Sequence, residues 1–264
     1  MIRAFAILCI CSLAACAPRP ESVEIPFEVL IDGRPASCTD VDRDLRLTDL
    51  RFYIHALRFI GPDGDLIPID LVPDDTWQNR DVAFIDLESG EGDCLNGSAA
   101  MNTVARGTYS GEPVQGLTFE IGVPETLNHR DPLLAEAPLG YSEMHWHWVS
   151  GYKFLRAGVT TDSDSYFLHL GSSRCAGTIG NIEGCRAANR PLVRLEHFRP
   201  GRDRVVIDLT ALFASVDLQD GIRTDCQSGP ANADCIGVFW KLGLAFETGQ
   251  PVAPAAVFGT GSGP

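Results

Sequence analysis

Hydrophobic and polar residues alternate with a period of two along most of the chain. Eight segments follow this pattern, are rich in Val, Ile, Phe and Tyr, and end at Gly, Pro, Asp or Asn. They are residues 23–31, 50–60, 66–71, 117–123, 166–170, 192–198, 205–209 and 236–246. A period of two is typical of half-buried β-strands. We therefore predict an all-β protein, an antiparallel β-sandwich with long loops and little helix.

Helical periodicity is limited to residues 210–216 and to residues 132–136, which lie within the long connection 124–140. The sequence contains no internal repeat and no linker that would divide it into domains. We expect a single domain over residues 23–258, preceded by a spacer at 16–22 and followed by a flexible tail at 259–264.

The N-terminus has the organisation of a bacterial export signal. Met-Ile-Arg precedes an apolar run from Ala4 to Leu13, and Leu13-Ala14-Ala15-Cys16 is similar to a lipobox. Residues 1–15 are then a signal peptide and Cys16 is the lipidation site. The run is too short to span a bilayer. We expect an exported protein, in the periplasm or at the outer membrane, held by a lipid anchor; a simple secretory peptide cut elsewhere is the alternative.

The cysteine content changes once the signal is set aside. The chain has nine cysteines, of which Cys9 and Cys11 leave with the signal and Cys16 carries lipid. An even set of six in an exported protein favours disulfides over metal thiolates, with fifteen possible pairings. The simplest set is Cys38–Cys94, Cys175–Cys185 and Cys226–Cys235. These six contain no Cys-x-x-Cys spacing, which argues against redox catalysis.

The charge balance excludes one class of partner. The chain has 35 acidic and 21 basic residues and a formal net charge of −14. Nucleic-acid binding requires clustered Lys and Arg. No basic run occurs here, and only two of the basic residues are lysines. We therefore expect no nucleic-acid partner.

The candidate chemistry lies in the histidines. In a strand, His145 and His147 would share one face while Trp146 and Trp148 share the other. His-x-His on a strand is a metal-ligand arrangement, although a tryptophan-rich strand at a sheet edge is also compatible with simple packing. His169 ends a predicted strand just before a glycine turn, and from such a position a side chain can reach into a site at the rim of the sandwich.

The positions of the remaining histidines can also be explained without a metal. His55 lies in a predicted strand as a buried residue or at a pocket wall, and a single hydrogen bond would satisfy it there. His129 lies in an Asn- and Asp-containing loop and is exposed in the alternative reading. His197 is expected to be a surface or packing residue.

Five segments together resemble the MbnP-like copper-binding family, the four-cysteine half of a "metallo-mystery pair". They are DLRFYIHALRF at 49–59, GVPETLNHRDP at 122–132, Met144-x-Trp146-x-Trp148 followed by GYKF at 151–154, FLHLGSSRC at 167–175, and Asn189-Arg190. They occur in family order over roughly residues 25 to 215. This combination is far more specific than any one segment.

The resemblance implies a metal-binding protein that is not itself an enzyme. It would hold one copper ion through His55, His129, His169 and a kynurenine made from Trp148, or alternatively from Trp146. A di-haem cytochrome c peroxidase-like enzyme of the MauG/MbnH type would install the kynurenine. Imidazole suits copper, whereas intact indole offers only an N–H donor. A role in copper acquisition or handling follows.

Two features depart from the family pattern. His145 and His147 stand where aromatic and small polar residues are expected, and could add a metal position or replace a ligand. Cys226 and Cys235 lie outside the usual four cysteines.

Two other classes of function remain open. Three histidines and a water would suffice for a zinc-dependent hydrolase, although no nucleophile motif, no His-Glu-x-x-His and no general base accompanies them. A metal-free cell-surface interaction lipoprotein is the other, with Trp77, Trp146, Trp148 and Trp240 as core or contact residues.

Overall fold

The computed structural model describes residues 20–218, 225–229 and 232–262. The predicted signal peptide and the lipidation site at Cys16 lie outside these residues. Within them, no helix combines the length and the hydropathy that a membrane crossing requires.

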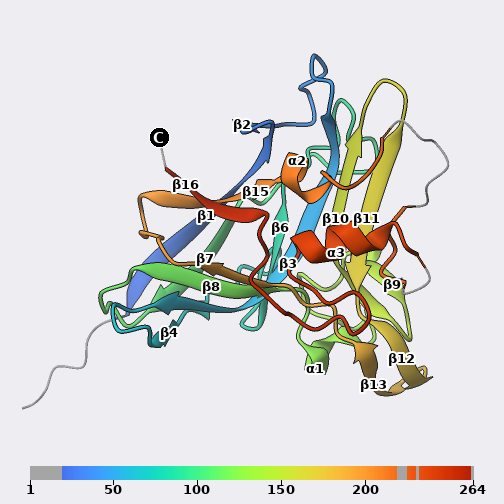
Figure 1. Ribbon diagram of the computed structural model, residues 1–264. Coiled ribbons are helices and arrows are strands. Elements are labelled where there is room, and N and C mark those ends of the chain that lie inside the picture. Colours follow the sequence, from blue (N-terminus) through green and yellow to red (C-terminus); the bar gives the residue numbers. More distant parts are fainter. Residues whose placement is uncertain (1–19, 219–224, 230–231, 263–264) are drawn as a thin grey trace, which may run out of the picture.

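Most strands belong to two mixed or antiparallel sheets (Figure 1). The first sheet has the order β16 (Phe258–Ser262), β15 (Asp203–Asp208), β1 (Glu21–Ile31), β7 (Val104–Tyr109) and β5 (Asp70–Leu71), with β2 (Arg34–Pro35) paired to β1. The pair β1–β15 is parallel, and the other pairs in this sheet are antiparallel. The prediction of antiparallel pairing is therefore correct except at this pair.

The second sheet is built around the long strand β3. Its order is β11 (Ser165–Gly171), β10 (Gly151–Thr160), β3 (Arg46–Ile60), β8 (Gly116–Ile121) and β14 (Leu192–Leu195). β4 (Leu66–Pro68) and β6 (Val82–Asp86) also pair with β3, and β9 (His145–His147) pairs with β10. A separate hairpin is formed by β12 (Ser173–Thr178) and β13 (Asn181–Ala187).

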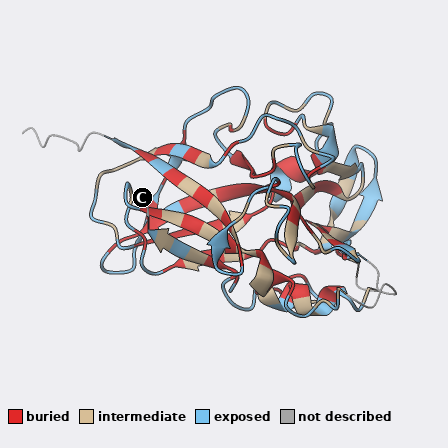
Figure 2. Cartoon of the chain, turned by 90° about the horizontal axis from the view of Figure 1, so that it is seen from above, coloured by how far each residue is buried: buried red, intermediate tan, exposed pale blue. Residues whose placement is uncertain are grey.

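The two sheets pack face to face around the main core. Phe27 on the first sheet makes edge contacts with Phe52 and Phe119 on the second, with ring centroids 5.7 and 5.9 Å apart. Phe258 of β16 closes the same cluster against Phe52. Buried residues follow the facing sides of both sheets, and exposed residues lie on the outer loops (Figure 2). The predicted all-β sandwich is confirmed.

A fork in the second sheet defines the region of the candidate site. β10 pairs with β3 at residues 46–52 and β8 pairs with it at residues 54–60. β6 pairs with residues 51–55 and overlaps both ranges, so β6 takes the opposite edge of β3 and leaves β8 and β10 on the same edge. In Figure 1, β8 and β10 leave β3 in different directions, and α1 (Glu125–Asn128) lies near the point where they diverge.

A second, smaller core covers the outer face of β3 at the fork. Tyr53 packs against Phe84 and Tyr152, with ring centroids 4.9 and 6.0 Å apart. Leu127, Leu139 and Met144 from the connection after β8 complete this cluster. The long connection thus acts as a lid over the outer face of the sheet.

Seven of the eight predicted strands are present, with shifted ends. The predicted strand 66–71 divides into β4 and β5. The predicted helix 210–216 is shorter, as α2 (Leu209–Leu212), whose N-cap Asp208 accepts a hydrogen bond from the Ala211 backbone N–H. The helical turn expected at 132–136 is wrong: the helix in this connection is α1, and a further 3₁₀ turn spans Ser142–Met144.

The prediction of a strand at residues 236–246 is also wrong. This segment contains α3 (Cys235–Lys241). Its buried residues are Cys235, Val238, Phe239 and Leu242, a spacing of three and four that matches a helix face rather than a strand. A Cβ on Gly237 would overlap the side chain of Ser215, so this glycine permits close packing of the helix.

The ends of the domain are more ordered than expected. Residues 259–262, predicted to be a loose tail, form most of β16, which pairs with β15. Glu21 and Ser22, assigned to the spacer, pair with Tyr109 and Thr108 of β7. Both segments gain ladder hydrogen bonds that a reading of composition does not reveal. Residues 263–264 lie outside the described residues.

The three predicted disulfides are confirmed. Cys38–Cys94 and Cys226–Cys235 are buried, whereas Cys175–Cys185 joins directly paired residues of the β12–β13 hairpin and is half-buried. These bridges involve all six cysteines that follow Cys16.

Candidate metal centre

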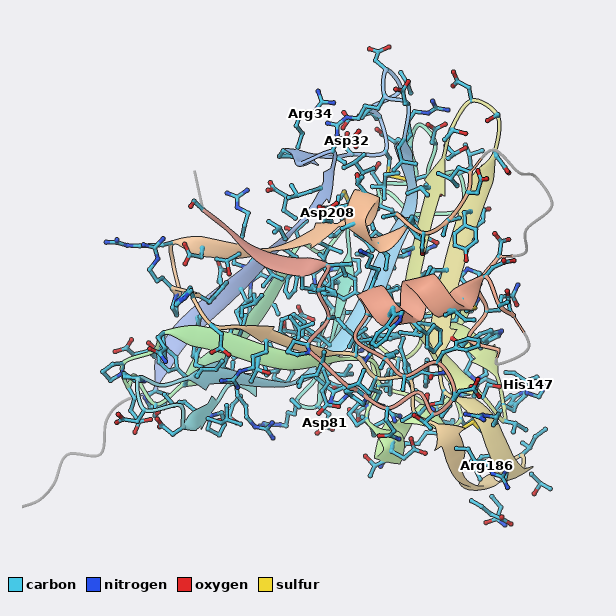
Figure 3. All side chains as sticks on the ribbon, viewed as in Figure 1. Asp32, Arg34, Asp81, His147, Arg186 and Asp208 are labelled. Atoms are coloured by element: carbon cyan, nitrogen blue, oxygen red, sulfur yellow. A yellow bond between two sulfur atoms is a disulfide. The ribbon has the colours of Figure 1, made fainter. Side chains whose placement is uncertain are left out.

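His55 lies on β3 at the fork. Its backbone pairs with Val82 on one side and Glu120 on the other, and the next residue, Ala56, has a positive φ of 53° at an irregularity in the pairing. The side chain borders a cavity of about 350 Å³ that Arg58, Asp81 and Pro124 also line. His55 is therefore mostly buried but has a route to solvent. Figure 3 labels Asp81 below β3, near the base of this region.

His129 ends α1 on the other side of the fork. Its Nε2 lies 3.6 Å from Glu125 Oε1, and Glu125 Oε2 accepts a hydrogen bond from Arg190 at 2.8 Å. Arg190 also donates to the Val123 carbonyl and stacks over the ring of Phe154. Arg190 thereby ties α1 to the start of β10.

Asn128 sets the position of this helix end. Its side-chain oxygen accepts a hydrogen bond from the Tyr152 backbone N–H at 3.0 Å, and its amide nitrogen lies 3.2 Å from His129 Nε2. Asn128 is fully buried. His129 is thus held against the first residues of β10.

His169 lies on β11, opposite Arg156 of β10. Arg156 pairs with the buried Asp49 at 2.7 Å, and Asp49 also binds Arg51 through both carboxylate oxygens. This buried ionic cluster lies beside His169 on the same sheet. Its net effect on the imidazole is to disfavour the protonated form.

The three imidazoles have lowered pKa values. Burial is the main cause in each case, and it lowers the pKa of His55 and of His169 to about 4. The positive charge of Arg190 lowers the pKa of His55 further, and that of Arg156 does so for His169. For His129, burial and Arg190 lower the pKa against the opposing effect of Glu125. Neutral imidazoles carry the lone pair that a metal requires.

Each of these three side chains also has a buried ring nitrogen without a hydrogen-bond partner among the described residues. These atoms are His55 Nε2, His129 Nδ1 and His169 Nε2. Buried polar atoms are normally paired, because an unpaired one costs about 1–3 kcal/mol. The donor set therefore fits a cation that prefers imidazole nitrogen.

The three nitrogens are not gathered into one pre-formed triad. Among the described residues, the groups whose ligand atoms lie within 4.8 Å of one another are His129 with Cys175 and Cys185, and Glu88 with Cys38 and Cys94. Disulfide sulfurs lack the charge of thiolates and are poor ligands. Binding of a single ion by His55, His129 and His169 therefore requires movement of side chains relative to this structure.

The His-Trp-His-Trp segment forms β9 and the bend that follows it. The rings of Trp146 and His169 lie nearly perpendicular, with their centroids 6.5 Å apart, and the Trp146 ring also packs on Gly171. Trp148 is 37% exposed, and its ring contacts His145 at 5.6 Å. The structure thus brings Trp146 next to a predicted ligand, whereas Trp148 lies at the surface beside His145.

The other three histidines are not among those with a buried, unpartnered ring nitrogen in the described part of the chain. His145 is half-buried against Tyr152, with ring centroids 5.5 Å apart. His147 is exposed, and its Nδ1 accepts a hydrogen bond from the Val149 backbone N–H; Figure 3 shows it at the outer edge of the molecule. His197 is exposed in the β14–β15 connection, as the sequence predicts.

Sequence reasoning missed the polar residues that organise the fork. Glu125, Asn128 and Arg190 connect α1, β10 and the segment before β14. All three lie within the segments that resemble the family, but the sequence assigns no role to them. Only the structure shows that they act together around His129.

Comparisons with known proteins agree with this organisation. The family model described as MbnP matches residues 20–228. The structure of MbnP from Methylosinus trichosporium is similar, with a TM-score of 0.81 and 28% sequence identity over 92% of this chain and 99% of that one. No curated protein matches the chain. Because the family model covers most of the described fold, including the whole fork, we conclude that this chain belongs to the MbnP family.

Proposed function

We propose that this protein binds one copper ion at the fork through His55, His129 and His169. The observation that carries the proposal is that each of these three side chains has one buried ring nitrogen with no hydrogen-bond partner among the described residues. Copper binds imidazole more tightly than most divalent metals do. The cavity beside His55 offers a path for the ion.

The fourth ligand in this proposal is a kynurenine derived from tryptophan. Opening an indole ring creates an aniline nitrogen and a ketone, either of which can bind a metal, whereas the indole N–H cannot. Trp148 is accessible to an oxidising partner because it is exposed. Trp146 is the alternative, and its contact with His169 favours it as a ligand.

The partner that would modify the tryptophan is a di-haem peroxidase of the MauG/MbnH type. The protein itself would be the substrate of that enzyme and a non-enzymatic accessory in copper acquisition or handling. Export and attachment to a membrane through lipidated Cys16 would place it in the periplasm or at the outer membrane.

Copper titration of purified variants tests the ligand set. Each of the substitutions His55→Ala, His129→Ala and His169→Ala should lower copper affinity at least tenfold, a loss of about 1.4 kcal/mol in binding free energy. His197→Ala is the matched control and should leave the affinity unchanged, because His197 is exposed and distant in the fold. If His145→Ala and His147→Ala are the damaging pair instead, the copper site lies at β9. Bound zinc with hydrolytic turnover would favour the hydrolase.

Peptide mass mapping of residues 140–153 tests the modification. Conversion of tryptophan to kynurenine adds one oxygen and removes one carbon, so the affected peptide changes by a defined mass. Protein from the native host should carry the change, and protein made without the partner should not. Trp148→Phe and Trp146→Phe variants identify the position. Unmodified tryptophans in native protein that holds a full equivalent of copper would contradict the kynurenine ligand.

A further inference from the structure

The β12–β13 hairpin carries a disulfide that differs from the other two in its exposure. Cys175 and Cys185 are directly opposite residues of the hairpin, and both are half-buried. Cys38, Cys94, Cys226 and Cys235 are at most 3% exposed. Exchange with a thiol requires access to a sulfur atom. Cys175–Cys185 is therefore the bridge that an external reductant reaches first.

His129 lies against this disulfide. The distance from His129 Nε2 to Cys185 Sγ is 3.4 Å. A ring nitrogen of His129 and the two sulfur atoms all lie within 4.8 Å of one another. Glu125 Oε1 lies 3.6 Å from the same nitrogen. One imidazole and two sulfurs from different elements thus converge at the edge of the fork. The hairpin projects from the lower end of the molecule in Figure 3, where Arg186 of β13 is labelled.

We propose that reduction of Cys175–Cys185 creates a second metal site, in which the two thiolates and His129 bind Cu(I). Two thiolates are soft ligands and Cu(I) is a soft ion. The oxidised bridge has no thiolate to offer, so the site exists only in the reduced protein. It is a redox-gated site that has only His129 in common with the group of histidines at the fork.

The chemistry balances with a dithiol as the reductant. The dithiol loses two electrons and two protons and becomes a disulfide, while the Cys175–Cys185 bond breaks and each sulfur takes up one electron and one proton. Binding of Cu(I) then displaces both thiol protons to solvent, because thiolate is the ligand form. An external disulfide reverses the exchange: it takes up the two electrons and two protons and becomes a dithiol, the Cys175–Cys185 bond re-forms, and the Cu(I) ion loses its thiolate ligands.

This inference goes beyond the proposed function and does not depend on it. It requires neither His55, His169 nor a modified tryptophan. His129 is the one residue that the two sites share. Cysteine variants affect only the new site, and His55→Ala affects only the fork.

The test begins with partial reduction of the full-length protein by a hydrophilic dithiol, followed by alkylation of a sample and peptide mapping. Labels should appear on Cys175 and Cys185 before any appear on Cys38, Cys94, Cys226 or Cys235. A second sample of the reduced protein is not alkylated. It is freed of dithiol under exclusion of oxygen and then titrated with Cu(I) in competition with a chromophoric chelator. It should bind one more Cu(I) per chain than oxidised protein, with a thiolate-to-copper absorption in the ultraviolet.

Three variants assign the ligands. Cys175→Ser/Cys185→Ser should lose the additional Cu(I) and the absorption. His129→Ala should weaken this binding at least tenfold, which is about 1.4 kcal/mol, and His197→Ala should not. The proposal is overturned if the buried bridges reduce first, if reduced protein binds no more Cu(I) than oxidised protein, or if His129→Ala binds the additional ion unchanged. Because the reduced wild type is measured directly, a poorly folded variant does not decide the outcome.

Discussion

At the scale of single residues, the imidazoles of the fork are notable because each keeps one buried ring nitrogen without a hydrogen-bond partner among the described residues and remains neutral. Burial lowers the pKa of His55 and of His169 to about 4, and a neighbouring arginine adds to this effect in each case. A folded chain that holds uncharged imidazoles in this way loses stability in acid, since its unfolded form takes up the protons more readily. The same property keeps the nitrogens available to a metal at neutral pH.

We predict that the metal-free protein loses stability as the pH falls from 6.5 to 4. The folded-state pKa values lie below the unfolded value of 6.5, so the unfolded chain binds more protons in this window and stability rises with pH. Each histidine contributes at most about 3 kcal/mol. Urea unfolding of wild type and of the His55→Gln/His169→Gln variant at pH 7.5, 5.5 and 4.5 measures the effect.

The difference in pH dependence between wild type and the His55→Gln/His169→Gln variant isolates the contribution of these two histidines. Asp86, whose pKa burial raises to about 7, acts in the opposite direction: it stabilises the folded state below pH 3.8 and this contribution is lost as the pH rises through 7. Since Asp86 is present in both proteins, it cancels. Equal pH dependence in wild type and variant would show that these imidazoles take up protons as readily in the folded state as in the unfolded chain, which would contradict the prediction.

At the scale of elements, the fork depends on close contact between the end of α1 and the start of β10. Gly151 has a φ of +79°, and a Cβ there would overlap both the carbonyl and the side-chain oxygen of Asn128. Asn128 in turn binds the Tyr152 backbone N–H and contacts His129. A glycine is therefore required for geometry and for space at this point.

Gly151→Ala should lower the free energy of unfolding by about 2–4 kcal/mol, since it adds steric overlap to an unfavourable backbone conformation. It should also weaken copper binding, because Asn128 and His129 must move. Gly33→Ala is the matched control: Gly33 has a φ of +69° but no atom within 4 Å of the added Cβ. Chemical denaturation and copper titration of both variants compare them. A loss of stability no greater than that of Gly33→Ala would contradict the tight contact.

The strands show how far the sequence predicts this architecture. Alternating apolar residues identify β1, β3 and β8 because one face of each enters the main core. The alternation does not identify β10, because its polar residue Arg156 is only partly exposed and pairs with the buried Asp49, which lies on another strand far away in sequence. Alternation cannot reveal a buried ion pair. At the fork, the histidines were found through a family resemblance, whereas the connection from Arg190 through Glu125 to His129 exists only in the folded chain.

At the scale of the whole molecule, three disulfides brace different parts of the sandwich. Cys38–Cys94 closes a loop with a sequence separation of 56 and is buried in the main core, while Cys175–Cys185 closes one of 10 in a peripheral hairpin. Cys226–Cys235 connects the residue paired with β11 to the start of α3. Bridges over longer loops restrict the unfolded chain more strongly.

We predict that the protein purified from an oxidising compartment contains no free thiol among these six cysteines. We also predict that the bridges Cys38–Cys94 and Cys175–Cys185 differ in their effect on stability. By loop entropy, Cys38–Cys94 contributes about 4 kcal/mol and Cys175–Cys185 about 3 kcal/mol. Replacement of each pair by Ala should therefore lower the melting temperature more for Cys38/Cys94, and the buried cavity left there acts in the same direction.

Thiol labelling of the denatured, non-reduced protein and thermal unfolding of the two double variants provide the measurements. The excess loss of the Cys38→Ala/Cys94→Ala variant should be several degrees, since about 1 kcal/mol corresponds to roughly 2–4 °C in a domain of this size. Two or more reactive thiols per chain would rule out the closed scaffold. A larger loss in the hairpin variant would instead mean that β12–β13 supports the fork and the main sandwich, and that opening its bridge disturbs more than the local site around His129.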